Sequence, residues 1–183
     1  MGRVAFPHTT PLQVSVIYPS GSAASILSEF SQQLQAVLDI VQVQPVPVNM
    51  ASAEALAKAI RDARCDLLAI VRGGGDSLEF AVFEYPSVVS ELAAKPVYRV
   101  TGIGHADTKT PLDLICECSV DTPTAAGAYI RNAVFRYRQE AAQAVQLAAK
   151  LRKTQRYLQW LTVACTVLLV LALGFLLLHF YRR

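Results

Sequence analysis

Three short loops of the sequence carry residues that can hold a phosphate group: residues 19–22 (PSGS), 72–77 (RGGGDS) and 102–105 (GIGH). Glycines let backbone N–H groups come close to an anion, and an arginine can supply a two-pronged hydrogen bond to it. A single glycine-rich loop more often makes only a tight turn, but three such loops favour a phosphate-bearing ligand. The candidate phosphate-binding residues are Ser20, Gly21, Gly73, Gly74, Gly75, Ser77 and Gly104, and Arg72 is the candidate clamp. A Walker loop is excluded, because no Gly-Lys-Ser/Thr follows the glycines.

His105 is the candidate for acid–base chemistry, because an imidazole changes its charge near neutral pH. Asp107 is close enough in sequence to orient it. The alternative is that a single histidine at a strand end has a structural role. No carboxylate cluster suited to a two-metal nuclease is evident, so no metal ligand is assigned, and Mg²⁺ is left open as a cofactor.

Strand and helix patterns alternate along the part of the chain that carries these loops. Strands are expected at residues 13–18, 41–48, 66–71, 95–100 and 114–120, and helices at residues 22–38, after Ser52, at 85–94 and after Thr122. The unbroken apolar run 66–71 predicts a central strand, and Pro45 and Pro47 predict an edge strand. This order predicts a single α/β domain with a mainly parallel, Rossmann-like sheet. In such a sheet the three loops all follow strands, where ligands bind.

The four cysteines indicate a reducing compartment and a packing role. They include no Cys-x-x-Cys pair, and Cys165 lies in the apolar C-terminal segment. Cys116 and Cys118 are two residues apart, which on a strand places both on one face of a sheet.

Residues 158–181 contain no Asp, Glu, Lys or Arg. A helix of roughly 20 apolar residues crosses a hydrocarbon core of about 30 Å, so this segment predicts one transmembrane helix. A buried core helix is the alternative. Residues 182–183 are then a short tail.

The formal net charge of +3 is strongly segregated. Residues 1–130 hold 8 basic and 13 acidic side chains, whereas residues 131–156 hold 7 basic side chains and only Glu140 as an acid. Basic residues next to a membrane segment favour the cytoplasmic face and its anionic lipids. A merely solvated helix face is the alternative. Since no signal peptide precedes the domain, we expect a single-pass tail anchor in the cytoplasmic membrane, with the globular domain on the cytoplasmic side.

Residues 124–157 predict a basic helical stalk between a globular domain at 1–123 and the membrane helix. Apolar residues recur along it at 4-3 spacing, as in a coiled coil: Ile130, Val134, Tyr137, Ala141, Ala144, Ala148, Leu151 and Leu158. This seam predicts a homo-oligomer, and the equally weighted alternative is a helix that covers its own domain.

The run from Val14 to Tyr129 resembles the catalytic domain of the exonuclease VII large subunit. The segments DLLAIVRGGGDSLEF, AKPVYRVTGIGH and DTPTAAGAYI carry the resemblance in order and spacing, over about two-thirds of the chain. It implies a domain that degrades single-stranded DNA together with a small subunit. The family's arginine before the glycines falls on Arg72, and its histidine falls on His105.

Several positions depart from the family's pattern. Ala106 stands where the family has a glutamate after the histidine, and Thr108 stands where it has an aspartate, although Asp107 is one position early. The carboxylate expected after the first strand falls near Ser25, and Asp76 looks inserted. This sequence also shows neither the family's OB-fold nor the long coiled-coil arm to which the small subunit docks.

Two functions follow from the sequence. The first is a membrane-anchored exonuclease VII-like phosphodiester hydrolase in which Arg72, His105 and Asp107 act on single-stranded DNA or a related nucleotide. The second is a catalytically degenerate nucleotide or nucleic-acid sensor, in which ligand binding drives oligomerisation of the stalk and membrane helix. The two missing carboxylates favour the second for mechanism. A purely structural membrane scaffold is the third alternative. The expected partners are single-stranded DNA or nucleotide, membrane lipids and further copies of the chain. A separate small subunit is left open as a partner, because its usual docking arm is absent.

Overall fold

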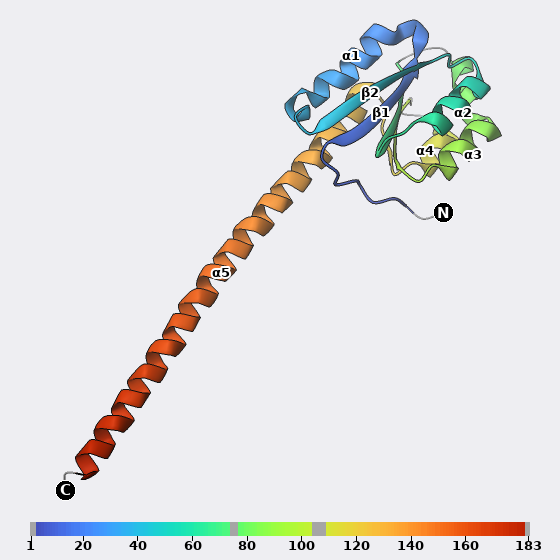
Figure 1. Ribbon diagram of the computed structural model, residues 1–183. Coiled ribbons are helices and arrows are strands. Elements are labelled where there is room, and N and C mark those ends of the chain that lie inside the picture. The colour runs from blue at the N-terminus through green and yellow to red at the C-terminus, as the bar shows by residue number, and fades with distance from the viewer. Residues whose placement is uncertain (1–2, 74–76, 104–108, 182–183) are drawn as a thin grey trace. The chain divides into compact units, whose positions relative to one another are not determined.

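The computed structural model describes residues 3–73, 77–103 and 109–181 (Figure 1). The chain forms two compact units, the first ending at Tyr137 and the second beginning at Arg138. Each unit is described separately below.

The N-terminal unit is built on a five-stranded sheet, and each pair of neighbouring strands in it is parallel. The strands are β1 (Leu12–Pro19), β2 (Val41–Val48), β3 (Leu67–Val71), β4 (Tyr98–Gly102) and β5 (Cys118–Ser119), in the order β2-β1-β3-β4-β5. The predicted parallel α/β sheet is therefore confirmed. Its order differs from the 3-2-1-4-5-6 order of dinucleotide-binding sheets and matches the other common doubly wound order, so the narrower description as Rossmann-like is not confirmed.

The central and edge positions in the sheet follow the sequence pattern. β3 lies between β1 and β4, and each of its five residues is buried, as its unbroken apolar run predicts. β2 is an edge strand and contains Pro45 and Pro47. Because proline has no N–H to donate, it is tolerated at a sheet edge.

Helices cover both faces of the sheet. One face packs against α1 (Ala23–Leu34), the 3-10 helix η2 (Gln35–Val37) and the first turns of α5 (Pro123–Tyr181). The other face packs against α2 (Ala53–Asp62), the 3-10 helix η3 (Ser77–Glu84), α3 (Pro86–Ala94) and α4 (Pro111–Ile115). A further 3-10 turn, η1 (Ser20–Ser22), joins β1 to α1. The result is a three-layer α/β/α domain.

Two helices begin where their capping residues predict. The hydroxyl of Ser52 accepts a hydrogen bond of 3.1 Å from the backbone N–H of Ala55 at the start of α2. The hydroxyl of Thr122 accepts one of 3.0 Å from the N–H of Ala125, and α5 begins at Pro123. Proline suits this first position, because its missing N–H has no partner inside the helix.

The predicted fifth strand is present, but the predicted bounds of residues 114–120 are wrong, because most of this run is not a strand. Pro111–Ile115 forms α4, and only Cys118–Ser119 pair with β4. Asp113, the third residue of α4, accepts hydrogen bonds from the backbone N–H and the hydroxyl of Thr110, both at 2.9 Å, which fixes a helix start before the apolar residues. Cys116 and Cys118 consequently pack with opposite faces of the sheet, not with one.

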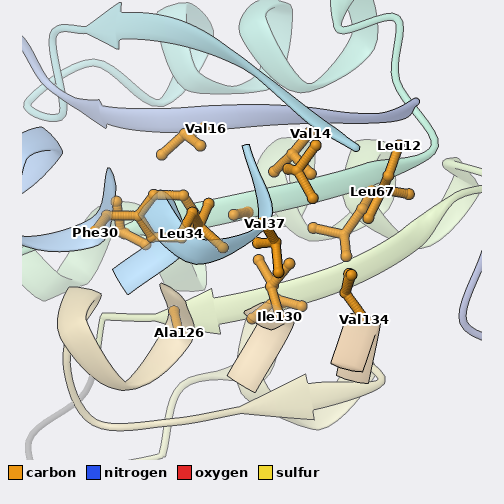
Figure 2. Packing of buried hydrophobic residues seen from close by; sticks show 14 of the residues in the cluster. Leu12, Val14, Val16, Phe30, Leu34, Val37, Leu67, Ala126, Ile130 and Val134 are labelled. Carbon is orange, nitrogen blue, oxygen red and sulfur yellow. The ribbon is translucent and has the colours of Figure 1, made fainter. Parts of the chain in front are cut away.

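The first turns of α5 belong to the core of the N-terminal unit. Figure 2 shows Ala126, Ile130 and Val134 facing the same buried cluster as Phe30 and Leu34 of α1. The first two positions of the apolar seam, Ile130 and Val134, therefore cover the chain's own domain. For these two positions the structure favours a helix that covers its own domain over a contact between copies of the chain.

Two glycines allow this close packing of α5. A Cβ atom on Gly127 would lie 2.5 Å from the carbonyl oxygen of Phe30, and one on Gly102 would lie 2.8 Å from that of Thr122. Backbone atoms cannot move aside as a flexible side chain can. Both contacts therefore require the absence of a side chain.

The C-terminal unit contains the rest of α5. Within the described residues, α5 is the one helix that is long and apolar enough to cross a membrane, and its most apolar window has a mean hydropathy of 1.9 with none of it buried. This agrees with the length and composition on which the predicted membrane helix rests. Crossing of a membrane stays a prediction.

A buried ion pair joins several segments at the amino-terminal end of β4. Arg99 Nη2 lies 2.6 Å from Glu117 Oε1, and each side chain is only 4% exposed. Arg99 also donates to the carbonyl oxygen of Leu92 at the end of α3, and Glu117 accepts from the N–H of Val4. Burial opposes the charge of Glu117, but the hydrogen bonds from Arg99 and Val4 together hold its pKa below the ordinary value.

We expect Glu117→Gln to lower the free energy of unfolding by about 3 kcal/mol at neutral pH, because it leaves the Arg99 charge buried without its counter-ion. A lowered carboxyl pKa stabilises the fold above the ordinary glutamate pKa of about 4.3, and this stabilisation is lost as the pH falls from there through the lower pKa of the folded state. The difference between wild type and variant should therefore shrink in acid. Urea denaturation of the full chain in detergent at pH 7 and pH 3 measures it, and an equal difference at both pH values would contradict the expectation.

Gly127→Ala should destabilise the N-terminal unit by about 1–3 kcal/mol, because the added methyl group meets the backbone of α1. Gly21→Ala is the matched control, since its Cβ would meet nothing within 4 Å and we expect little change. Thermal unfolding, followed by the near-ultraviolet circular dichroism of the buried tyrosines, compares the two. Equal melting temperatures for both variants would show that α1 and α5 do not need this close approach.

Candidate functional site

The parallel register of β1, β3 and β4 brings the carboxyl ends of these strands to the same level. The predicted phosphate-binding loops follow these ends. Ile17 of β1 pairs with Ile70 of β3, and Val71 pairs with Gly102 of β4. The N–H of Arg72 continues this ladder with a 3.1 Å hydrogen bond to the carbonyl oxygen of Gly102. The segments that follow β1, β3 and β4 therefore begin at the same edge of the sheet.

A cavity of about 220 Å³ lies at this edge, between the ends of β1 and β3. The residues after β1 contribute Ser20 and Gly21, and those after β3 contribute Arg72 and Gly73. The segment after β2 adds Asn49. The structure thus brings together four of the residues that the sequence singles out for phosphate binding, and we call this the strand-end cavity.

The other predicted site residues are less fully described. Ser77 is the first residue of η3. Gly74, Gly75, Gly104, His105 and Asp107 lie outside the described residues. The acid–base role of His105 with Asp107 therefore stays a prediction.

Arg72 is buried, and its guanidinium is oriented by an aromatic ring. The side chain is 3% exposed, and its central carbon lies 4.1 Å from the ring centroid of Phe80 in η3. A guanidinium is always charged and stacks readily on aromatic faces, which limits the directions in which it can point. Arg72 therefore places a fixed positive charge at the wall of the strand-end cavity.

The two glycines of the cavity differ in what they allow. A Cβ on Gly21 would meet only open space, so this position borders the cavity without crowding. A Cβ on Gly73 would lie 3.2 Å from Cδ1 of Ile26 in α1, so Gly73 packs closely against that helix. α1 begins at Ala23, two residues after Gly21, and the N-terminus of a helix adds partial positive charge at this edge.

Asp113 is a buried carboxylate whose importance the sequence reasoning missed. Besides its two bonds from Thr110, it accepts hydrogen bonds from the hydroxyls of Thr101 at 2.7 Å and Ser119 at 2.9 Å. It thereby holds β4 just before Gly102 and also holds Thr110, so one carboxylate fixes both ends of the segment that contains His105. The signal that could have found it is the Thr110-x-x-Asp113 spacing of a capping box.

The described lining of the strand-end cavity suits an anion and does not by itself fit Mg²⁺. It includes the guanidinium of Arg72 and no carboxylate. Among the residues in the described ranges, no group of three or more His, Cys, Asp or Glu could hold a metal ion. A role for Mg²⁺ stays a prediction.

The described cysteines of the N-terminal unit are not prepared for metal binding or nucleophilic attack. Burial raises the pKa of the Cys65, Cys116 and Cys118 thiols above the ordinary value. A thiolate is the reactive form, so these residues stay protonated at neutral pH. Their surroundings support the expected packing role.

We expect Asp113→Asn to lower the free energy of unfolding by about 2 kcal/mol, because the amide presents N–H donors to hydroxyl and N–H groups that need an acceptor. Ser119→Ala is the control, since it removes one donor and leaves the carboxylate its three other hydrogen bonds. Urea denaturation of the full chain in detergent measures both. A smaller loss for Asp113→Asn than for Ser119→Ala would contradict the central role of this carboxylate.

Comparison with known proteins identifies the family. The family model described as "Exonuclease VII, large subunit" matches residues 7–165. Proteins named exodeoxyribonuclease 7 large subunit are 35% identical over 127 residues in Parasynechococcus marenigrum (strain WH8102) and 31% identical over 121 residues in Nitrosomonas eutropha. These matches cover 66% and 63% of this chain but 32% and 27% of the relatives, so the chain spans about a third or less of their length. Because this family model matches well over half of the residues of the chain, the chain belongs to the exonuclease VII large subunit family.

Proposed function

We propose that the N-terminal unit binds a phosphate group of single-stranded DNA, or of a related nucleotide, in the strand-end cavity. The observation that carries this proposal is the buried, ring-stacked guanidinium of Arg72 at the cavity wall beside Gly73, Ser20 and Gly21. The cavity lies between β1 and β3, where the strand order reverses. Ligands of doubly wound sheets bind at such a switch point, outside the carboxyl ends of the strands.

The family supports nucleic acid as the ligand. Its relatives are named exodeoxyribonucleases, and the family implies nucleic-acid binding and nuclease activity. In a hydrolytic reaction Arg72 would hold the phosphate and offset its developing charge, while His105 would move the proton and Asp107 would orient the imidazole. A family small subunit is the partner that such an enzyme would take.

A nucleotide or nucleic-acid sensor is the second candidate function, and the family's carboxylate positions favour it. Ala106 and Thr108 stand where the family has a glutamate and an aspartate. A domain that keeps the phosphate contact of Arg72 but lacks these groups would bind without cleaving. Binding would then promote self-association of the C-terminal part of α5.

We further propose that α5 anchors the protein in the cytoplasmic membrane, with the N-terminal unit on the cytoplasmic side. Residues 158–181 carry no charged side chain, and four cations precede them: Lys150, Arg152, Lys153 and Arg156. Each cation near an anionic membrane surface contributes about 1 kcal/mol of attraction.

Arg72→Gln should weaken the binding of a 5′-phosphorylated oligonucleotide by about 10- to 100-fold, because a hydrogen bond to a charged group is worth about 1.5–3 kcal/mol. Arg61→Gln is the matched control, since Arg61 pairs with Glu91 of α3 and is not in the lining of the strand-end cavity. Fluorescence anisotropy with full-length protein in detergent and EDTA measures binding. Equal affinity for wild type and Arg72→Gln toward a mononucleotide would overturn the proposed site.

The degradation of single-stranded DNA, with and without Mg²⁺, distinguishes the two functions. Loss of activity in both Arg72→Gln and His105→Ala would establish the hydrolase. A folded wild-type protein that binds the oligonucleotide and leaves it intact would establish the sensor.

A further inference from the structure

A second and larger cavity, of about 550 Å³, lies between β2 and α2. Gln44 and Val46 of β2 line one side of it, and Ala55, Lys58 and Ala59 of α2 line the other. Arg64, which follows α2, lines it as well. We call this the β2–α2 groove, and none of the phosphate-binding residues predicted from the sequence lies in its lining.

The groove adjoins the strand-end cavity. Val48 and Asn49, at the end of β2, line both. Gln44 and Asn49 are five residues apart, which corresponds to a length of roughly 17 Å along an extended strand. Because stacked nucleotides rise about 3.4 Å each along one strand, this length accommodates about five nucleotides.

The charge of the two linings is opposite to that of the surrounding domain. Residues 1–130 carry 8 basic and 13 acidic side chains. Among the residues that the structure describes, the two linings include three cations, Lys58, Arg64 and Arg72, and one carboxylate, Asp62. Cations are thus concentrated where an anionic chain could lie, although the domain as a whole would repel it.

Between its charged side chains, the wall formed by α2 has two small apolar residues. Ala55 and Ala59 are four residues apart and so share one face of the helix, whereas the larger Leu56 and Ile60 fill the core. Arg61 is directed to α3, where it forms a 2.6 Å ion pair with Glu91. A wall of alanines leaves space for flat bases, and the amides of Gln44 and Asn49 can bond to base edges.

We propose that the β2–α2 groove holds the nucleotides that adjoin the phosphate in the strand-end cavity, with Lys58 and Arg64 contacting their phosphates. The ligand is then a short single-stranded oligonucleotide and not a mononucleotide. This inference rests on the proposed function, and its grounds are the two residues that line both cavities and the local charge. The strand-end cavity, with Arg72, binds one phosphate. Each further nucleotide of the ligand then increases its affinity through the β2–α2 groove, up to a length of about five nucleotides.

The test measures how affinity depends on ligand length, with full-length protein in a zwitterionic detergent and EDTA. Thymidine monophosphate and thymidine oligonucleotides of two, four, six and ten residues compete with a labelled oligonucleotide. For wild type we expect affinity to rise at least tenfold from the mononucleotide to six residues and then to level off. Lys58→Ala/Arg64→Ala should lose this rise, and its salt dependence should fall by about 1.4 in log–log slope, or about 0.7 for each phosphate contact to a single strand.

Two control variants separate the groove from other cations. Arg61→Ala removes one charge from the face of α2 that meets α3, and Lys150→Ala/Lys153→Ala removes two charges from the C-terminal unit. Both should keep the full dependence on length. Lys58 and Arg64 are exposed, so their replacement should leave the melting temperature unchanged.

The outcomes distinguish this inference from the function on which it rests. Arg72→Gln should weaken the mononucleotide and the oligonucleotides by the same factor. If wild type binds all lengths equally, or if only the Lys150→Ala/Lys153→Ala variant loses the dependence on length, the groove is overturned and the strand-end site stands. If wild type binds no nucleotide of any length, both fall.

Discussion

The positions of the described candidate residues depend on the parallel register of β1, β3 and β4. β3 is buried on both faces and pairs with β1 on one side and with β4 on the other, so a slip of one residue would exchange the side chains that enter the two apolar clusters and disturb the packing of both. The same register sets the level at which each strand ends. Ser20 and Arg72, which are far apart in the sequence, therefore meet at one cavity.

Close backbone packing and buried charge hold the helices to this sheet. Gly127 lets α5 approach α1, and Gly102 lets the start of α5 approach β4. At the other end of β4, the ion pair of Arg99 and Glu117 joins α3, the strand and the N-terminal segment. α5 thus supplies core side chains to the N-terminal unit before it continues as the helix of the second unit.

The arrangement of charge resolves a conflict between composition and family. An acidic domain binds nucleic acid poorly through nonspecific attraction, which depends on the neutralisation of phosphates. In this domain the described walls of the strand-end cavity and the β2–α2 groove carry three cations and one carboxylate. The proposed binding through these cavities would require the ligand to fit them, and specificity would follow from that requirement.

The sequence by itself determined the features that depend on neighbours along the chain. The apolar run of β3, the prolines of β2 and the caps at Ser52 and Thr122 predicted a central strand, an edge strand and two helix starts, because each depends on periodicity or on a hydrogen bond within one turn. The strand predicted at residues 114–120 is shorter in the structure, because an apolar run suits either a strand or a helix, and Asp113 fixes a helix start through Thr101 and Ser119 as well as its neighbour Thr110. Only the tertiary structure decided the strand order, the separation of Cys116 from Cys118 and the adjacency of the two cavities at Val48 and Asn49. These features arise from pairing and packing between segments distant in sequence, which no local pattern encodes.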